Sequence, residues 1–450
     1  MMNREMYAQF GNAIAHLAEQ APKVEMPDAQ RVQRAKEVML QKIDRNLAVD
    51  LESCVRCGYC ADACQFSVQN DDPDLIPTHK LDLLRRVWRR ELAPMSWLWK
   101  PFTPDVSADD LRQWQALCFD SCTECGRCSM VCPMGINIAR GVNVMREALA
   151  AAGLAPDELR AVQSEQDARG TVFGADASHL AEAVEAVRRR GVTVHLDKPK
   201  AKVLMLTTVL DILLFQDALD ATARVLNAAG LDWTLRSNGY EAANFGLLSG
   251  VEETQKKASE AVIRQAIEIG AEMVIVPECG HAYPALRWEG AEVHGGPLPF
   301  RVLAISELIG ELVEQGKLPL RGDAHQTLMF HDACKLGRHG GVFEQPRLAL
   351  RATGAELREP RDTEEMNWCC GGGAGGFLIN RAAPLRAQAF AIKRAQVDNS
   401  DAQAIVTSCG SCRLNFLAGA EQTAWDKPVL SLVELVAQNL KENPLPSATS

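Results

Sequence analysis

Apolar residues follow two different patterns along the chain. In residues 1–48, and again in residues 146–198, apolar positions recur at helical spacing, which predicts helices in both segments. From about residue 199 onward, short apolar runs alternate with helical patterns, as in residues 203–206 (Val-Leu-Met-Leu) and 327–330 (Thr-Leu-Met-Phe). We interpret these runs as buried strands, and their alternation with helices predicts an α/β fold for this part of the chain.

The α/β part contains an internal repeat. Residues 203–206 resemble residues 327–330, residues 237–245 align with residues 369–377, and the segment around Cys279 aligns with the segment around Cys409. In each comparison the second copy lies about 130 residues after the first. The similar offsets predict one duplicated unit, with a first copy over residues 199–320 and a second over residues 321–440.

Bulk composition is that of a globular protein. The chain has 450 residues, of which 47% are apolar and 24% are charged, and this length leaves room for about two to four domains. A net charge of -10 argues against nucleic acid as a partner. We expect no signal peptide, because the first residues lack a basic region followed by an apolar run. The most apolar run, residues 203–215, is too short to span a bilayer. We therefore expect a cytoplasmic protein whose thiols stay reduced.

Two cysteine runs precede the repeat. Residues 54–64 and 122–132 both have the spacing C-x2-C-x2-C-x3-C, the signature of bacterial two-cluster ferredoxins, in which the fourth cysteine of each run ligates the other cluster. Zinc also binds C-x2-C pairs, but the doubled run and Pro133 favour iron–sulfur clusters. Gln65 departs from the signature, because a proline is expected there. We assign one [4Fe–4S] cluster to Cys54, Cys57, Cys60 and Cys132, and the other to Cys64, Cys122, Cys125 and Cys128.

A further group of cysteines lies in the second copy of the repeat. Residues 368–377 have the sequence Trp-Cys-Cys-Gly-Gly-Gly-Ala-Gly-Gly-Phe. Adjacent side chains of a strand point to opposite faces, so Cys369 and Cys370 can share a metal centre only where the chain bends, and the glycines permit a bend. Cys334 lies upstream, and Cys409 and Cys412 lie downstream. Five thiols around a bend favour a metal or iron–sulfur site over inert buried cysteines or a structural zinc site.

The first copy of the repeat keeps a single cysteine, Cys279, and therefore lacks the ligands for a second such site. Because Cys279 aligns with Cys409, we expect it to face the same cavity from the opposite side. It is either an inert buried thiol or a redox-active group that forms a transient bond with substrate sulfur or with the centre. In the second case, His281 would serve as a proton donor near neutral pH.

The long insert between the two ferredoxin-type runs, residues 65–121, combines basic and aromatic residues. This combination is typical of an element that docks on a membrane surface or a partner. The alternative is a solvated helix with tryptophans packed in the core. The basic and aromatic residues of the insert are Arg85, Arg86, Arg89, Arg90, Trp97 and Trp99.

We expect Cys118, just before the second run, to be a buried thiol.

The pattern of Cys334, the Cys369-Cys370-Gly371 triplet and Cys409-x-x-Cys412 resembles the CCG motif of the heterodisulfide reductase catalytic-subunit family. Within that family, the cytoplasmic iron–sulfur subunits of sulfite-reductase-associated membrane complexes are most similar, because they also pair an intact CCG unit with a degenerate one. The resemblance implies that the five cysteines hold part of a noncubane [4Fe–4S] centre that acts on a disulfide. It also implies partners: a membrane quinone-reactive subunit, a flavoprotein or both, and a small thiol, disulfide or protein sulfur carrier.

Motifs and resemblance together predict an α+β and α/β protein, in which a helical two-cluster ferredoxin-like domain is followed by two pseudo-repeated α/β CCG units. The predicted segments are a helical arm (1–48), a ferredoxin-like domain (49–145) with its insert (65–121), a helical linker (146–198), a degenerate CCG unit (199–320) and an intact CCG unit (321–440).

These features predict the iron–sulfur subunit of a membrane-linked oxidoreductase complex, which passes electrons between two [4Fe–4S] clusters and a CCG site acting on a disulfide, thiol or sulfur substrate. The chain has no apparent nucleotide-phosphate loop or flavin fingerprint, so a partner must supply the ultimate donor. The alternative is a pure electron relay from a flavin subunit to quinone, as in the iron–sulfur subunits of glycolate oxidase and anaerobic glycerol-3-phosphate dehydrogenase.

Overall fold

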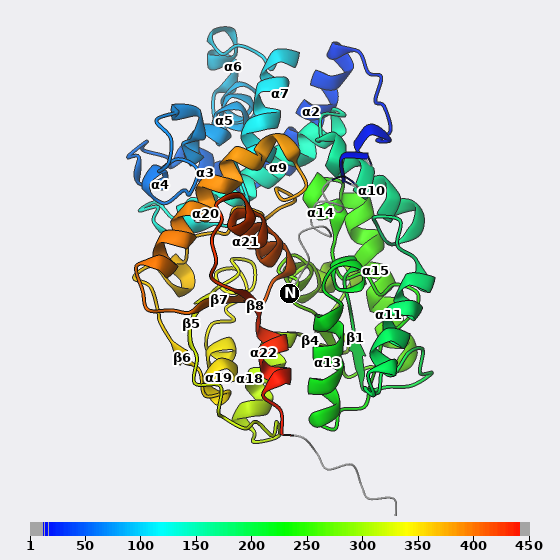
Figure 1. The fold of residues 1–450 in the computed structure, drawn as a ribbon. Helices are drawn as coiled ribbons and strands as arrows, with labels where there is room; N and C mark the ends of the chain where they lie inside the picture. The colour runs from blue at the N-terminus through cyan, green and yellow to red at the C-terminus, as the bar shows by residue number, and fades with distance from the viewer. Residues whose placement is uncertain (1–11, 13, 17, 442–450) are drawn as a thin grey trace, which may run out of the picture.

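In a computed structural model, residues 12, 14–16 and 18–441 are described (Figure 1). Residues 1–11, 13 and 17 of the predicted helical arm (1–48) therefore lie outside the described residues. Within the described ranges, no helix combines the length and the apolarity that crossing a bilayer requires.

The cysteine-run part of the chain is built from short helices. Both runs adopt the same local backbone: Gly58 and Gly126, which follow the second cysteine of each run, have φ of 89° and 78°, and Arg56 and Glu124 are also left-handed. This repeated turn starts the short helices that carry the third cysteine of each run, Tyr59–Asp62 and Arg127–Met130. The helices are α2 (Asp28–Lys42), α3 (Arg45–Glu52), α4 (Tyr59–Asp62), α5 (Asp82–Val87), α6 (Ser96–Trp99), α7 (Ala108–Gln115), α8 (Arg127–Met130) and α9 (Ile138–Ala151).

Tighter and wider turns connect these helices. They are 3₁₀ turns at Pro73–Leu75, Pro77–Leu81 and Lys100–Phe102, and π turns at Trp88–Leu92 and Ala116–Asp120. Helices α2 and α9 pack against each other, and this helical part forms the upper end of the molecule in Figure 1. Two further helices, α10 (Asp157–Arg169) and α11 (Ala177–Arg189), lead to the α/β part.

The α/β part consists of two four-stranded parallel sheets with equivalent strand orders. The first sheet has the order β2-β1-β3-β4 and the second the order β6-β5-β7-β8. The predicted fold class is confirmed, including the strands expected from the apolar runs at residues 203 and 327. The strands are β1 (Val203–Met205), β2 (Trp233–Thr234), β3 (Met273–Val276), β4 (Arg301–Ala304), β5 (Thr327–His331), β6 (Glu356–Leu357), β7 (Ala404–Thr407) and β8 (Val429–Ser431).

Helices cover both sheets and join the two units. The helix α13 (Gln216–Ala228) of the first unit packs against α22 (Leu432–Gln438) of the second, and α18 (Ile305–Glu314) packs against α19 (Glu344–Ala352). The other helices are α12 (Val209–Leu213), α14 (Phe245–Ser249), α15 (Glu252–Ile269), α16 (Ala282–Arg287) and α17 (Gly290–His294) in the first unit, and α20 (Ala383–Asp398) and α21 (Gly410–Gln422), with 3₁₀ turns at Glu364–Met366 and Asn380–Ala382, in the second.

A buried arginine ties the helical part to both α/β units. Arg146, on α9, is fully buried and donates hydrogen bonds to the carbonyl oxygens of Cys122 (2.8 Å), Leu248 (3.3 Å) and Ala374 (2.7 Å). These carbonyls belong to the second cysteine run, the first α/β unit and the glycine-rich loop of the second unit. A single guanidinium therefore fixes the relative positions of the three segments that surround the site. The boundaries of the five segments predicted from the sequence stay predictions.

Candidate functional site

The glycine-rich loop bends sharply and brings the cysteines of the second unit together. Gly371 has φ of 90°, and a Cβ there would lie 2.6 Å from the Cβ of Ala389, so a side chain is excluded on both grounds. Cys409 follows β7 by two residues and Cys412 lies in the first turn of α21. All five predicted ligands are buried, because they lie where the carboxyl ends of β5 and β7 meet the loop: Cys334, Cys369, Cys370, Cys409 and Cys412.

The five thiols form a continuous row. Cys369 contacts the thiols of Cys334 and Cys370, Cys370 contacts Cys412, and Cys412 contacts Cys409. Hydrogen bonds from Cys369 and Cys412 lower the pKa of the Cys370 thiol well below its usual range. A dense set of buried sulfur donors suits an iron–sulfur centre, since thiolates are the ligands that such centres require.

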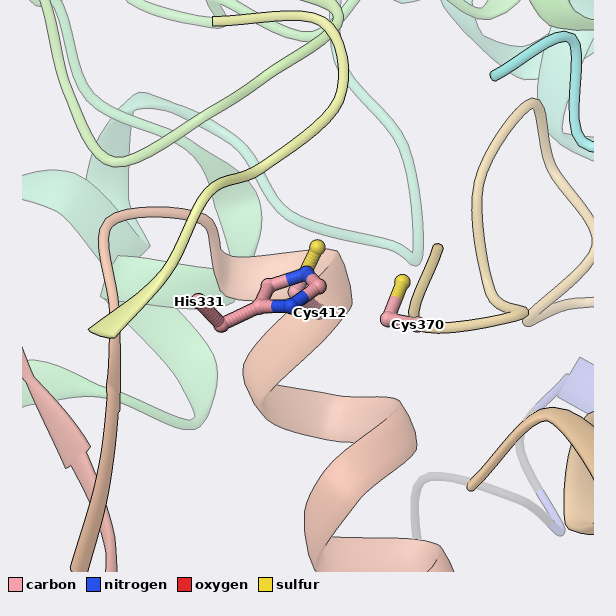
Figure 2. Close-up of side chains that lie close together, drawn as sticks. All are labelled: His331, Cys370 and Cys412. Atoms are coloured by element: carbon pink, nitrogen blue, oxygen red, sulfur yellow. The ribbon is translucent and has the colours of Figure 1, made fainter. Parts of the chain in front are cut away.

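Figure 2 shows His331 beside two of these cysteines. One ring nitrogen of His331 and the Sγ atoms of Cys370 and Cys412 lie within 4.8 Å of one another, and all three residues are buried. Sequence reasoning missed His331. Its one sequence signal is its place at the end of the strand that leads to Cys334.

The second ferredoxin-type set surrounds a cavity. The cavity is lined by all four predicted ligands of one cluster and by the buried Lys80, whose Nζ donates to Ser121 Oγ at 2.6 Å. Four converging thiols fit a [4Fe–4S] cluster. The lysine would place a positive charge beside an anionic cluster bound in this cavity, and no sequence pattern singles it out. The four cysteines are Cys64, Cys122, Cys125 and Cys128.

The other ferredoxin-type set lies nearer to solvent. Burial raises the pKa of Cys60, and the charges of Cys54 and Cys57 raise it further, so these three thiols lie near one another. The Sγ of Cys54 is 3.1 Å from Thr78 Oγ1, and Cys57 is exposed. The fourth predicted ligand, Cys132, is half-buried and comes just after α8.

The cavity set directly adjoins the CCG cysteines. The Cys125 thiol contacts Cys369, and Thr123 Oγ1 lies 3.3 Å from Cys369 Sγ. Gln65, at the position where the signature has proline, is 1% exposed and donates from Nε2 to Thr123 Oγ1 at 3.1 Å. The departure from the signature therefore places a buried amide between the two sets of thiols.

The first α/β unit also reaches the CCG cysteines. A Cβ at Gly280 would lie 3.4 Å from Cys409 Sγ, and Gly410 N donates to Glu278 O at 2.6 Å. Burial raises the pKa of the Cys279 thiol, with the charge of Cys409 adding to the effect. A redox role for Cys279 stays a prediction, and it would require a thiolate that burial disfavours.

The surroundings of His281 do not match the role of proton donor that we considered for it. Its Nε2 accepts a hydrogen bond from Ala374 N at 2.8 Å, in the glycine-rich loop, and burial lowers its pKa to about 4. The ring is therefore neutral at physiological pH and supports the loop, which does not suit a proton donor near neutral pH.

The insert combines features of both predicted alternatives. Arg85 is buried and donates to Leu51 O at 2.9 Å, and Arg86 pairs with Asp110 at 2.6 Å, so these cations serve the fold. Trp97 and Trp99, by contrast, are 72% and 56% exposed. The alternative that placed the tryptophans in the core is wrong.

The other exposed apolar side chains of the same turn are Leu92, Met95, Leu98 and Phe102. We call this group, with Trp97 and Trp99, the aromatic tip. Cys118 is fully buried, and burial raises its pKa to about 12.

Comparison with known proteins adds to this geometry. A 4Fe-4S dicluster domain matches residues 50–136 and a CCG cysteine-rich domain matches residues 328–417. One subunit of the dihydromethanophenazine:CoB–CoM heterodisulfide reductase of Methanosarcina mazei is 25% identical over 400 residues, covering 87% of this chain and 94% of its own length. The chain therefore combines a 4Fe-4S dicluster domain with a CCG cysteine-rich domain, and it is similar to this heterodisulfide reductase subunit over most of its length.

Other similar proteins have different names and differ in length. An Hdr-like menaquinol oxidoreductase iron-sulfur subunit 2 of Archaeoglobus fulgidus is 24% identical, covering 78% of this chain and 72% of its own length. The EtfAB:quinone oxidoreductase of Syntrophomonas wolfei is 26% identical, covering 84% of this chain and 56% of its own length. The two domain matches and these similarities support an iron–sulfur electron-transfer subunit of an oxidoreductase with [4Fe–4S] clusters.

Proposed function

We propose that the protein passes electrons through two [4Fe–4S] clusters to or from a centre held by Cys334, Cys369, Cys370, Cys409 and Cys412, where a disulfide, thiol or other sulfur substrate reacts. The observation that carries this proposal is the contact between Cys125 and Cys369. It places a predicted cluster ligand against a CCG cysteine, so no other subunit is needed to bridge the two sites.

The three sets of cysteines would form a series of sites. Cys54, Cys57, Cys60 and Cys132 would hold a distal cluster near the surface. The cavity set would hold a proximal cluster beside the CCG thiols. When bound, such clusters accept and donate single electrons, and the CCG centre would bind sulfur. The polypeptide contributes partial burial, since Cys125 is buried and the other three proximal cysteines are half-buried, and the positive charge of Lys80 beside them.

The distal end suits exchange with a partner. Exposed apolar side chains surround this end. They are Val55 (66% exposed) and Tyr59 (59%) in the first run, and Met130 (50%) and Met134 (49%) beside Cys132. Apolar side chains around a solvent-facing thiol are typical of an electron-transfer interface rather than of a free surface. We propose that a quinone-reactive membrane subunit or a flavoprotein exchanges electrons here, and that the protein works at the cytoplasmic face of the membrane.

A pure electron relay is the second candidate. The relatives named as quinone oxidoreductases favour it, and so does the single intact CCG unit, because the first unit offers only Cys279. In this case the CCG centre would carry electrons without binding a sulfur compound.

The experiment is electron paramagnetic resonance on the anaerobically purified full chain, with added thiol and disulfide probes. We expect three distinguishable iron–sulfur signals, of which the one lost in Cys370→Ser also changes on adding 2-mercaptoethanesulfonate or its disulfide. Cys279→Ser should keep that signal. Wild-type protein with zinc and no iron at these sites would contradict the proposal. A CCG signal that no sulfur probe changes would support the relay.

A further inference from the structure

His331 presents a buried nitrogen that the described part of the chain leaves without a hydrogen-bond partner. The residue ends β5, is fully buried, and its Nε2 has no hydrogen-bond partner among the described residues. An unpaired buried polar atom is costly, so native structures rarely keep one without a purpose. A ring nitrogen of His331 and the Sγ atoms of Cys370 and Cys412 lie within 4.8 Å of one another, which makes these sulfurs the candidate acceptors (Figure 2).

The orientation of the neighbouring amide is fixed by its own partners. Asn367 donates from Nδ2 to the carbonyl oxygen of Asp332 at 2.7 Å, and its Oδ1 accepts from Nζ of the buried Lys393 at 2.8 Å. A carbonyl can only accept and an ammonium can only donate. The amide therefore cannot be flipped, and its NH₂ group lies on the side of His331.

This amide decides which ring nitrogen of His331 carries the proton. Nδ2 of Asn367 lies 3.3 Å from Nδ1 of His331. Because Nδ2 is a donor, Nδ1 has to accept and cannot carry hydrogen, which excludes both the imidazolium and the Nδ1–H tautomer. The proton is on Nε2. The ring is also held in place by Phe416, whose ring packs edge-on at a centroid distance of 4.8 Å.

We propose that His331 is a positioning residue of the CCG centre, which donates an Nε2–H···S hydrogen bond to a sulfur at Cys370 or Cys412. The proposal rests on the proposed function, in that these cysteines ligate the centre. Hydrogen bonds to cluster sulfurs stabilise the more negative, reduced state, so this donor raises the reduction potential of the centre. Lys393 and Asn367 act through His331 by fixing its tautomer.

The first test is pulsed magnetic resonance of the wild-type full chain with ¹⁵N-labelled histidine, in H₂O and in D₂O. We expect a weak nitrogen coupling and one exchangeable proton coupling on the CCG signal. Both should be absent in His331→Leu. A strong nitrogen coupling would mean direct ligation of iron by the ring, and no nitrogen coupling would mean a packing role; either result overturns the proposal.

The second test is the midpoint potential of the same signal. We expect a shift to lower potential in His331→Leu, a smaller shift in Asn367→Ala, where the tautomer is no longer fixed, and partial recovery in His331→Gln, whose amide can still donate. The two ferredoxin-type signals in the same molecules should not move and serve as the control. Unchanged potentials in all three variants would refute the inference alone, whereas a wild type without a CCG signal would refute the proposed function.

Discussion

Glu241 places a carboxyl group in the core of the first α/β unit. It is 4% exposed, and its two oxygens accept hydrogen bonds from Val209 N at 2.9 Å and Ala243 N at 2.8 Å. Burial raises its pKa to about 8, because the ionised form loses its hydration. The folded protein therefore holds a proton that the unfolded chain, with a pKa of 4.5, releases.

This difference predicts a pH-dependent stability. Between about pH 4.5 and pH 8 the folded state binds more protons at Glu241 than the unfolded state, so stability falls as pH rises, by up to about 1.4 kcal/mol per pH unit, and levels off above pH 8. Glu241→Gln should remove this contribution. We expect the melting temperature of the variant to gain on that of the wild type from pH 5 to pH 8.5.

The matched control is Asp401→Asn. Asp401 is exposed, and its hydrogen bond from Arg358, which stays charged across the window, lowers the pKa of its carboxyl, so it stays ionised there. Its melting difference from wild type should be constant. A constant difference for Glu241→Gln as well would show that its carboxyl is ionised in the folded state.

At this scale the sequence predicted residues whose partners follow a local spacing. Of the thirteen proposed iron–sulfur ligands, eight were recognisable because thiols at C-x2-C intervals have few other uses, and the others because they complete these runs or accompany the Cys369-Cys370 pair at the glycine bend. Thr123, Lys80 and His331 were not recognisable. Each is an ordinary residue whose relevance comes from a partner that folding brings close. Thr123, for example, contacts Cys369, which lies far along the chain.

The aromatic tip is the element whose composition least suits its exposure. Trp97, Trp99 and Phe102 stand on α6 and the following 3₁₀ turn, while the neighbouring Arg90 pairs with Asp105 at 3.5 Å. An apolar group of this size on the surface is typical of a docking site. The partner consistent with the proposed function is the membrane subunit.

Replacing the tip should therefore weaken membrane association. For Trp97→Ser, Trp99→Ser and Phe102→Ser combined, we expect at least about tenfold weaker binding to membranes that contain the partner, because buried aromatics dominate interface energies. Iron content should be unchanged. Trp288→Ser, at a residue 55% exposed on the first α/β unit, is the control. Equal membrane binding by both proteins would show that the tip faces solvent in the complex.

The elements themselves were predictable to different degrees. The strands at residues 203 and 327 were found because a run of buried apolar residues between helices has few alternatives. The insert was harder to predict, because the sequence does not show whether Arg86 forms an ion pair or whether the tryptophans are buried. The ion pair of Arg86 with Asp110 depends on how α7 folds back on α5.

The whole molecule arranges its thiols in one series. The distal set is partly exposed, and the CCG set is buried. The cavity set adjoins both, because the charge of Cys60 acts on Cys128 and Cys125 contacts Cys369. Sequence reasoning predicted each set but not their order in space. Contacts such as Cys125 with Cys369 depend on the docking of domains, which no local pattern encodes.

This series predicts unequal effects of losing the two ferredoxin-type clusters. Cys128→Ser removes a ligand of the proximal set and should slow reduction of the CCG signal by an external one-electron donor much more than it slows reduction of the distal cluster. Cys57→Ser, at the exposed distal end, should lower reduction from a protein donor but leave reduction by a small diffusible dye intact. Freeze-quench spectroscopy separates these rates. Equal slowing of the CCG signal by both variants with the dye would contradict the series.

The burial of the CCG cysteines has a consequence for how the protein matures in the cell. None of the five is more than 8% exposed, and the loop that carries Cys369 and Cys370 is fixed by Arg146 and His281 from two other parts of the chain. We therefore expect iron to reach these thiols before the three parts dock, so that metal supply sets the time at which the chain closes. Cells starved of iron should accumulate an open, protease-sensitive form instead of a folded apoprotein.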